Sequence, residues 1–513
     1  MIDAAKSSTS MPLVEAIARW LVHSHAAFYT PGHKGGASVL PEISQLLGSA
    51  LRADLPELPG LDNLFSPEGV IEEAQALAAQ AFGGDRTWFL ANGSTCGIEA
   101  ALLATCRPHD RIIVPRNAHQ SIISGLILSG AMPIFVQPAY DPVWDMALGL
   151  SLAQVRSALE QYPEAVAVML VSPTYYGVCC EIEAIANLVH AHQMPLLVDE
   201  AHGPHFGFHP GLPPSALSAG ADLTVQSTHK VLSALTQASM LHLHGFGLPG
   251  RSPYRISPDR IQKALQMVQS SSPSYLLLAS LDAARQQMAT EGKALMERTI
   301  ALAQDARSRL AAIPGLRVLE QSDLGEEISL TLDITRLTVD VTELGLTGFD
   351  ADEILSEQLG VVAELPTLKT LTFIISLGNS SADIERLVQG FTVLARQHRK
   401  TVPPSNGAQV SQADAQVVPF EASIPAIAVP AMSPRDAFFA DSEAVAIATA
   451  VGRISAELVC PYPPGIPVLL PGEIITAEAV QYLRHILAAG GTVTGCADST
   501  LETLRVVVRP LRD

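Results

Sequence analysis

Cysteine is scarce in this chain and shows no pattern typical of a disulfide framework or a metal site. Only six of the 513 residues are cysteines, none of them lies in a C-x-x-C spacing, and the adjacent pair cannot easily bridge. The composition is therefore not that of a disulfide-stapled secreted protein. We interpret all six as reduced core residues: Cys96, Cys106, Cys179, Cys180, Cys460 and Cys496.

Long apolar runs are absent, and the first residues do not indicate a leader. An apolar run such as residues 165–171 is far shorter than the roughly 20 residues that cross a bilayer. Residues 1–10 contain no basic region followed by an apolar stretch, which is the mark of a secretory signal. We therefore expect a soluble, cytoplasmic protein.

Charge is low, and what there is has one dominant sign. Charged residues make up 16% of the chain and hydrophobic residues 48%, which argues against disorder and favours a packed enzyme partly covered in an oligomer. The 51 acids and 32 basic residues give a net charge of −19, which repels nucleic acid and anionic membranes. The acidic field can attract cationic metabolites, or it can simply keep the protein in solution.

Between about residues 85 and 240, short β-rich runs alternate with longer helical patterns such as residues 96–106 and 182–192. Strands that are apolar throughout and separated by helices predict an α/β fold with a mostly parallel sheet covered on both faces. Ligands of such folds bind outside the carboxyl ends of the strands. The expected strands are residues 87–91, 111–114, 133–137, 165–171, 195–198 and 223–226.

The rest of the chain predicts two further units. A helical stretch at 275–312 precedes a strand–helix alternation up to residue 398, and a polar segment that opens with proline and glycine follows. We therefore expect a large domain, a smaller α/β domain, a linker and a C-terminal α+β domain. Their predicted ranges are 1–285, 286–400, 401–415 and 416–513.

One lysine and one aspartate occupy strand ends in the predicted sheet. Lys230 comes shortly after the strand at 223–226, and Asp199 directly follows the strand at 195–198. Enzymes that use pyridoxal phosphate need such a pair, a lysine to hold the cofactor aldehyde and an acid to keep the ring nitrogen protonated. Taken alone, Lys230 could be a surface lysine and Asp199 could pair with an arginine.

Two other strand–helix junctions carry polar groups suited to a cofactor. Ser94 and Thr95 follow Gly93 where a helix begins, so hydroxyls and free N–H groups could face an anion, although a plain helix cap has the same composition. His119 opens the next helix and could stack on a flat heterocycle or relay a proton, although a lone histidine is more often structural. The order of all four features along the chain favours the cofactor interpretation.

The spacing of three histidines requires a test for a metal site. His202, His205 and His209 form an H-x-x-H-x-x-x-H pattern, but Pro204 and Pro210 argue against one helix that presents them on a single face. No cysteine lies nearby. We therefore expect no metal.

Taken together, these segments resemble the bacterial ornithine/lysine/arginine decarboxylase family of fold type I pyridoxal-phosphate enzymes. The similarity extends over essentially the whole chain and is strongest to the compact branch that includes short bacterial arginine decarboxylases. The chain has no room for the N-terminal wing domain of the large acid-induced members. The segments that carry the resemblance are TPGHKGG at 30–36, PRNAH at 115–119, SPTYYG at 172–177, DEAHG at 199–203, STHK at 227–230 and YPPGIP at 462–467.

The resemblance implies roles for individual residues around the ring of pyridoxal 5'-phosphate. Lys230 would attach to the cofactor covalently and Asp199 would pair with its ring nitrogen. His119 would stack on the ring, with Ala201 and His202 beneath or beside it. The implied catalytic set is Lys230, Asp199, His119 and His202.

The resemblance also implies which groups would hold the cofactor phosphate. They are the hydroxyls of Ser94, Thr95 and Ser227 and the imidazole of His229. Gln120 departs from the pattern, because many relatives have lysine there, and should alter only the surroundings of His119.

The expected activity is decarboxylation of a basic L-amino acid, with arginine favoured, giving agmatine for polyamine synthesis. Lysine and ornithine stay open, and the alternatives are an aminotransferase or lyase of the same fold or a non-catalytic regulatory homologue. We expect a homodimer or higher even-numbered assembly with active sites between subunits. The segment 271–275 and the acidic loop 54–62 could then reach a neighbour's site, or the loop could be a solvated turn.

Overall fold

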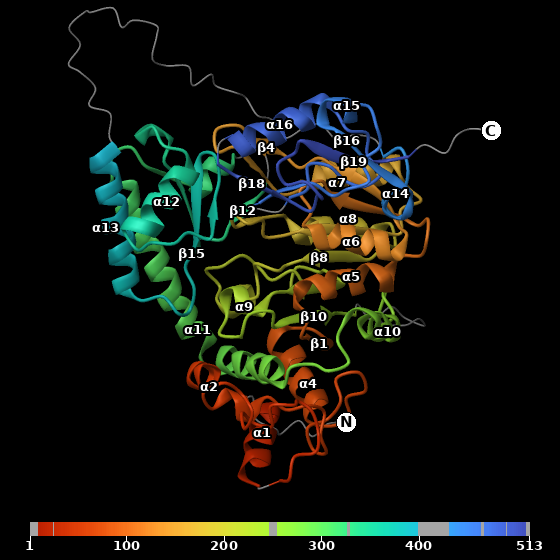
Figure 1. Cartoon of the computed structure of the whole chain (residues 1–513), viewed down its shortest axis with the longest axis vertical. Helices are drawn as coiled ribbons and strands as arrows, with labels where there is room; N and C mark the ends of the chain where they lie inside the picture. The colour runs from red at the N-terminus through yellow and green to blue at the C-terminus, as the bar shows by residue number, and fades with distance from the viewer. Residues whose placement is uncertain are drawn as a thin grey trace, which may run out of the picture.

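The computed structural model describes residues 9–23, 25–245, 254–325, 329–398, 430–462, 466–488 and 490–508. A large domain lies around a central sheet, a smaller domain lies beside it, and the C-terminal domain covers the edge of both (Figure 1). The predicted linker at 401–415 lies outside the described residues. Within the described ranges, no helix is both long and apolar enough to cross a membrane.

The central sheet has seven strands, and six of them are the strands that the sequence predicts. Only β10 runs antiparallel to its two neighbours, β1 and β9, and the remaining pairs are parallel. The mostly parallel α/β sheet is therefore confirmed. In spatial order the strands are β1 (Arg86–Leu90), β10 (Ser239–Leu243), β9 (Leu223–Gln226), β8 (Leu196–Asp199), β6 (Ala167–Val171), β2 (Arg111–Pro115) and β3 (Met132–Val136).

Strand β10 was missed because polar residues interrupt its apolar pattern. His242 is fully buried there, and its two ring nitrogens contact Thr87 Oγ1 at 2.8 Å and Gln226 Oε1 at 3.1 Å on the flanking strands. Those partners lie far away in the sequence. A buried polar side chain is tolerated when it is hydrogen-bonded, so the sheet itself makes this strand possible.

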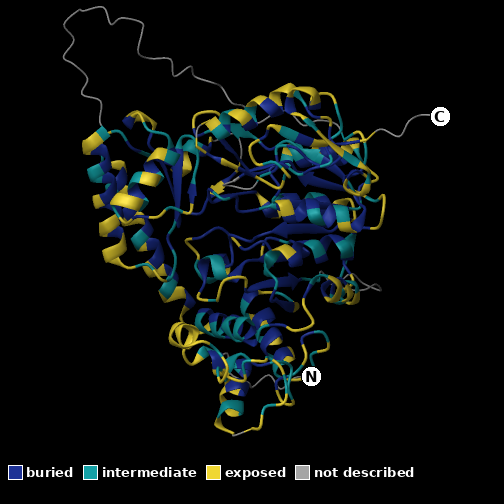
Figure 2. Ribbon diagram, in the orientation of Figure 1, coloured by how far each residue is buried: buried dark blue, intermediate teal, exposed yellow. Residues whose placement is uncertain are grey.

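Helices cover both faces of the sheet and leave its strands buried (Figure 2). Close packing depends on glycine at two places. A Cβ on Gly97 of α5 would lie 2.6 Å from Leu90 and 2.7 Å from Val225 in the sheet, and one on Gly125 of α6 would lie 2.4 Å from Leu102. The helices of this domain are α4 (Val70–Phe82), α5 (Gly93–Thr105), α6 (Gln120–Ser129), α7 (Leu152–Gln161), α8 (Ile182–Ala191), α9 (Thr228–Val231) and α10 (Pro258–Val268).

The N-terminal segment and several short strands complete the large domain. Helices α1 (Pro12–Val22), α2 (Pro41–Leu47) and α3 (Ala50–Ala53) lie at one end of the molecule (Figure 1). Strands β4 (Tyr140–Asp141) and β5 (Met146–Ala147) form a hairpin, and β7 (Val178–Cys179) pairs with β12 (Thr331–Leu332).

The long helix α11 (Tyr275–Ala311) links the large domain to the small one. Its buried side chains up to Ile300 belong to the core of the large domain, whereas those from Ala303 to Leu310 belong to the core of the small domain. The helix continues without a break through residue 285. The domain division stays a prediction, and the packing favours a boundary near residue 300.

The small domain is a four-stranded antiparallel sheet with helices packed on it. Its strands are β11 (Arg317–Val318), β13 (Arg336–Asp340), β15 (Thr370–Ile374) and β14 (Leu365–Pro366), and its helices are α12 (Gly348–Gln358) and α13 (Ser381–His398). The C-terminal domain has its own apolar core. Its elements are α14 (Pro434–Phe439), β16 (Ser442–Ala446), α15 (Ile447–Ala450), β17 (Cys460–Tyr462), α16 (Ala477–Ala488), β18 (Thr492–Thr494) and β19 (Thr503–Val507).

Candidate active site

Parallel strands bring the predicted lysine and aspartate to one edge of the sheet. Asp199 is the last residue of β8, where it pairs in register with Val171 of β6 and Val225 of β9. Lys230 lies in the short helix α9, which begins two residues after β9 ends. The carboxyl ends of these strands therefore form the floor of the candidate site.

The side-chain nitrogen of Lys230 lies beside an imidazole and an aromatic ring. Its Nζ lies 2.9 Å from His202 Nε2 and 5.7 Å from the centre of the Tyr175 ring. The rings of Tyr175 and His202 are 4.7 Å apart, centre to centre. Lys230 and His202 are thus in direct contact, as a shared catalytic role requires.

A buried guanidinium indicates which nitrogen of His202 carries the proton. Arg336 Nη2 donates to the backbone oxygen of His202 at 2.9 Å and lies 3.3 Å from its Nδ1. A guanidinium only donates, so Nδ1 accepts, and the proton of a neutral imidazole is then on Nε2. Nε2–H points at Lys230, which can accept that hydrogen bond only as a neutral amine.

Burial supports the same protonation states. Burial lowers the pKa of His202 well below its usual value, and the charge of Arg336, or of Lys230 whenever it is protonated, lowers it further. Burial also lowers the pKa of Lys230, although the nearby Asp199 carboxylate partly opposes this. Desolvation and a lowered pKa both favour the neutral amine, which is the nucleophilic form of lysine.

Asp199 is a buried acid without a cationic partner among the described side chains. It is 5% exposed, and its Oδ1 accepts a hydrogen bond from the backbone N–H of Ala201 at 3.1 Å. Burial raises its pKa, and the charge of Lys230 acts in the opposite direction. Because an unpaired buried carboxylate is costly, this position fits a protonated ring nitrogen of a bound cofactor.

His119 is the N-cap of α6. Its Nδ1 accepts a hydrogen bond from the backbone N–H of Ser121 at 3.2 Å, so the proton of the neutral ring lies on Nε2. Burial, helped by the charge of Lys230, lowers the pKa of His119 to about 4. A neutral, flat imidazole suits stacking on a heterocycle.

Two of the hydroxyls predicted to hold phosphate meet in space. Ser227 Oγ donates to Ser94 Oγ at 2.7 Å, although 133 residues separate them. Ser94 and Thr95 lie in the first turn of α5, where backbone N–H groups are free of helical partners. Thr95 is exposed and Ser94 is half-buried, so both hydroxyls are accessible at this helix start.

His229 would have to gain a proton to hold a phosphate. Its Nδ1 lies 2.9 Å from the carbonyl oxygen of Ala238, and because a carbonyl only accepts, Nδ1 carries the proton. Burial lowers the pKa of His229, which favours the neutral ring with Nε2 unprotonated. A bound phosphate dianion would favour the protonated form and convert Nε2 to a donor.

The other two histidines of the H-x-x-H-x-x-x-H pattern have separate partners. His205 Nε2 lies 3.1 Å from Asp333, and His209 Nε2 lies 2.7 Å from Glu297. Across the described part of the chain, no group of three or more His, Cys, Asp or Glu side chains could hold a metal ion.

The acids of loop 54–62 are engaged within the N-terminal segment. Asp62 accepts hydrogen bonds from the backbone N–H groups of residues 68, 69 and 71, and Asp54 lies 3.1 Å from His33. Tyr275 donates to the Asp62 carbonyl at 2.7 Å, so segment 271–275 and the loop adjoin within one subunit. These contacts favour a structural role for the loop acids.

Sequence reasoning missed three residues that shape the site. Arg336 is fully buried, and Tyr175 lies inside the SPTYYG motif without having been assigned a role. Glu200, in the DEAHG motif, accepts from Ala216 N–H and from Gln226, and burial raises its pKa to about 8. The tyrosine had a motif signal, whereas Arg336 had none.

Two family models match the chain. The model of the Orn/Lys/Arg decarboxylase major domain matches residues 11–332, and the model of the C-terminal domain matches residues 419–498. The first match alone covers more than half of the chain.

Relatives with a curated name agree with these matches. The chain is 41% identical to an arginine decarboxylase of Bacillus subtilis, with 98% of each chain covered, and 40% identical to one of Halalkalibacterium halodurans, with 97% of each covered. It is 27% identical to lysine decarboxylase LdcA of Pseudomonas aeruginosa, covering 93% of this chain and 75% of that protein.

Solved structures confirm the fold. Lysine decarboxylase A from Pseudomonas aeruginosa superposes with a TM-score of 0.80 at 24% identity, covering 97% of this chain and 80% of that one. The lysine decarboxylase LdcF of Francisella novicida gives 0.79 at 21% identity, covering 98% and 81%. The fold and the family that the sequence predicted are thus confirmed: this chain belongs to the Orn/Lys/Arg decarboxylase family and is a decarboxylase of a basic amino acid.

Proposed function

We propose that this decarboxylase acts on L-arginine and releases CO2 and agmatine, with pyridoxal 5'-phosphate as its cofactor. The observation that carries the choice of substrate is the identity of about 40%, over nearly the whole chain, to two proteins named arginine decarboxylase. Lysine and ornithine are the runner-up substrates, because the family includes both activities by name.

The described side chains fit the proposed cofactor. Lys230 would hold its aldehyde and Asp199 its ring nitrogen, which accounts for a buried acid without a described cation. His119 would cover a ring face, while Ser94 and Ser227 would bind the phosphate at the start of α5. When bound, pyridoxal phosphate supplies an electron-accepting ring for the bond that breaks.

The residues themselves provide proton transfer at one defined atom. His202 Nε2–H lies 2.9 Å from Lys230 Nζ, so a proton can move between them without rearrangement. Arg336 keeps the proton on that side of the ring by occupying Nδ1. Asp199, held by the Ala201 N–H, would present its carboxyl group to the ring nitrogen before the reaction begins.

A direct assay tests the activity. Purified protein is incubated with pyridoxal phosphate and, separately, L-arginine, L-lysine and L-ornithine, and both CO2 and the corresponding amine are measured. We expect CO2 and agmatine from arginine at the highest kcat/KM. Cadaverine or putrescine as the main product would move the substrate to lysine or ornithine, and a keto acid without CO2 would contradict decarboxylation.

We further propose that the enzyme works in the cytoplasm as a homodimer or higher even-numbered assembly and supplies agmatine for polyamine synthesis. An exposed apolar surface supports the assembly. Helix α2 has no buried residue, and Leu46 is 78% exposed beside Leu40 and Leu47 on the same short stretch. Such a surface is typical of a protein interface.

A further inference from the structure

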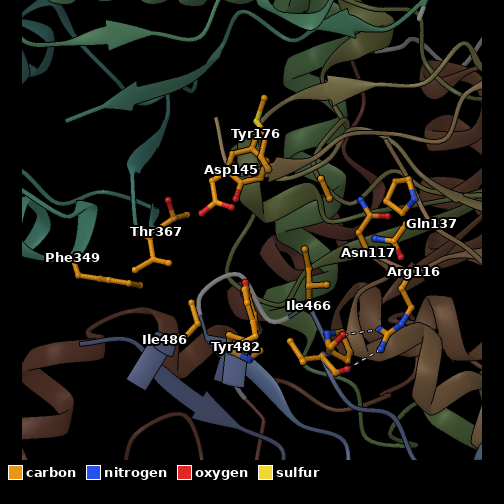
Figure 3. Close-up of a pocket in the computed structure, with 17 residues that line it drawn as sticks. Arg116, Asn117, Gln137, Asp145, Tyr176, Phe349, Thr367, Ile466, Tyr482 and Ile486 are labelled. Carbon is orange, nitrogen blue, oxygen red and sulfur yellow. Dashed lines mark hydrogen bonds between the residues drawn. The ribbon is translucent and has the colours of Figure 1, made fainter. Parts of the chain in front are cut away.

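A second pocket lies where the three domains meet (Figure 3). The large domain contributes Asp145 and Tyr176, the small domain Phe349 and Thr367, and the C-terminal domain Tyr482 and Ile486. In Figure 3 these side chains surround a common space, with the Asp145 carboxylate and the Tyr482 hydroxyl on opposite sides of it. None of the predicted cofactor residues lines this pocket.

Asp145 is the acid of this pocket, and its described contacts do not neutralise it. The Tyr140 hydroxyl donates a hydrogen bond to Asp145 Oδ1. Lys369 and His485 act on the carboxylate from beyond ion-pair distance, and Lys369 Nζ donates to the carbonyl of Pro142 at 3.0 Å. Burial raises the pKa of Asp145, while the Tyr140 hydrogen bond and the charges of Lys369 and His485 act in the opposite direction.

The basic residue that lines the same pocket, Arg116, is already paired with an acid. Arg116 donates to Glu473 at 3.1 Å and to the carbonyls of Pro467 and Val468 at 2.7 and 3.0 Å. Glu473 is 2% exposed, so the two charges form a closed buried pair. An anionic ligand would find no free positive charge here among the described residues, whereas a cation would find Asp145.

The remaining walls suit an aliphatic chain. Phe349, Ile466 and Ile486 face the space from the small and C-terminal domains, and Tyr176 and Tyr482 add aromatic rings. The cavity measures about 80 Å³. Because one water needs roughly 10–15 Å³ of such space, the cavity holds a chain of several methylenes but no nucleotide.

We propose that this pocket binds a short organic cation, an alkylamine or alkylguanidine, with its charged end on Asp145 and its methylenes against Phe349 and Ile486. The carboxylate supplies the counter-charge, and the tyrosine rings offer their faces to the cation. A ligand in this position contacts all three domains at once. Binding therefore stabilises their arrangement and raises the melting temperature.

Binding can be tested without turnover by isothermal titration of the full-length holoenzyme with 1,4-diaminobutane and with agmatine at about 0.15 M salt. The choice of agmatine as a probe rests on the proposed function, but the binding of either amine does not. We expect saturable binding that Asp145→Asn weakens at least about tenfold, which corresponds to about 1.4 kcal/mol. Asn suits this position, because residue 145 has a φ of +53° and Asn accepts the left-handed region.

Two further variants separate this pocket from the active site and from general attraction to an acidic protein. Lys230→Ala should still bind one amine in this pocket, since Lys230 does not line it. Glu160→Gln removes an exposed acid of α7 and should bind as the wild type does.

A further variant tests the pocket by blocking its space and leaves the charge of Asp145 unchanged. Ile486→Trp should fill the cavity and block binding while Asp145 remains, and an unchanged cofactor absorption spectrum shows that the variant is folded. Three results would each overturn the proposal: no saturable binding to the wild type, equal binding by Asp145→Asn, or complete loss of binding in Lys230→Ala. A lack of decarboxylase activity would overturn the proposed function and leave these binding results valid.

Discussion

At the scale of single residues, the candidate site depends on a hydrogen-bond chain from Arg336 through His202 to Lys230. Arg336 and His202 are buried and Lys230 is half-buried, so one distribution of protons along the chain is favoured. The guanidinium fixes the imidazole tautomer, and the imidazole in turn requires a neutral amine. Arg336 would thereby influence the protonation state of Lys230, the proposed nucleophile, through His202.

Replacing Arg336 should make Lys230 a weaker nucleophile at neutral pH. The positive charge of Arg336 lowers the pKa of Lys230, so Arg336→Gln should raise that pKa and move covalent attachment of pyridoxal phosphate to higher pH. A shift of one unit corresponds to a rate about tenfold lower at pH 7. The attachment rate is followed by absorbance across pH, with Arg309→Gln on the exposed side of α11 as the control. Equal pH midpoints for Arg336→Gln and the wild type would refute this role.

Buried neutral histidines should make the protein sensitive to acid. The folded state holds the pKa of His119 at about 4, below the ordinary histidine value of 6.5, so the unfolded chain binds more protons between these values. Stability is therefore fully present above about pH 6.5 and is lost as the pH falls towards 4.

We expect His119→Asn to flatten that dependence. Near pH 5 the free energy of unfolding should change by up to about 1.4 kcal/mol less per pH unit than in the wild type, the effect of one proton. Asn can still cap α6, which limits other effects. Urea unfolding of the cofactor-free protein at pH 5, 6 and 7 measures this, and parallel curves for the two proteins would count against a neutral His119.

At the scale of elements, the position of α5 relative to the sheet decides where the hydroxyls proposed to bind phosphate lie. Gly97 lets the helix approach Leu90 and Val225 closely, which brings Ser94 to Ser227. The contact between Ser94 and Ser227 therefore depends on Gly97, which lies three residues further along the helix.

A methyl group at Gly97 should therefore weaken both folding and cofactor binding. Gly97→Ala would place Cβ 2.6 Å from Leu90, so the helix must shift, at a cost of about 1–3 kcal/mol. The melting temperature and the dissociation constant of pyridoxal phosphate are both measured. Gly378→Ala is the matched control, because a Cβ there meets nothing within 4 Å. A normal cofactor affinity in Gly97→Ala would show that the helix position is not what places Ser94.

The elements also show what sequence patterns can predict. Six strands followed from their apolar runs, because neighbouring strands and covering helices bury them in a parallel sheet, and the long helix α11 followed from its helical apolar spacing. Strand β10 did not, since His242 is acceptable there only through Thr87 and Gln226. Motifs located Lys230, Asp199 and His119, but the contact of Arg336 with His202 joins residues 134 apart and leaves no local pattern.

At the scale of the whole molecule, the exposed apolar surface of α2 lies at the end of the molecule formed by the N-terminal segment (Figure 1). If subunits meet there, Leu46→Glu should place a charge in the interface and raise the dimer dissociation constant at least about tenfold. Sedimentation velocity over a range of concentrations measures this. Val362→Glu, at a similarly exposed apolar position in the small domain, is the control. An unchanged association state for Leu46→Glu would exclude α2 from the interface.

The most direct measurement is a crystal structure of the protein grown with pyridoxal phosphate. We predict that Lys230 Nζ is bonded to the cofactor carbon that bore the aldehyde and that the Asp199 carboxylate lies within hydrogen-bond distance of the ring nitrogen. Electron density that joins the cofactor to another lysine, or that places Asp199 out of reach of the ring, would contradict the assignment of this site.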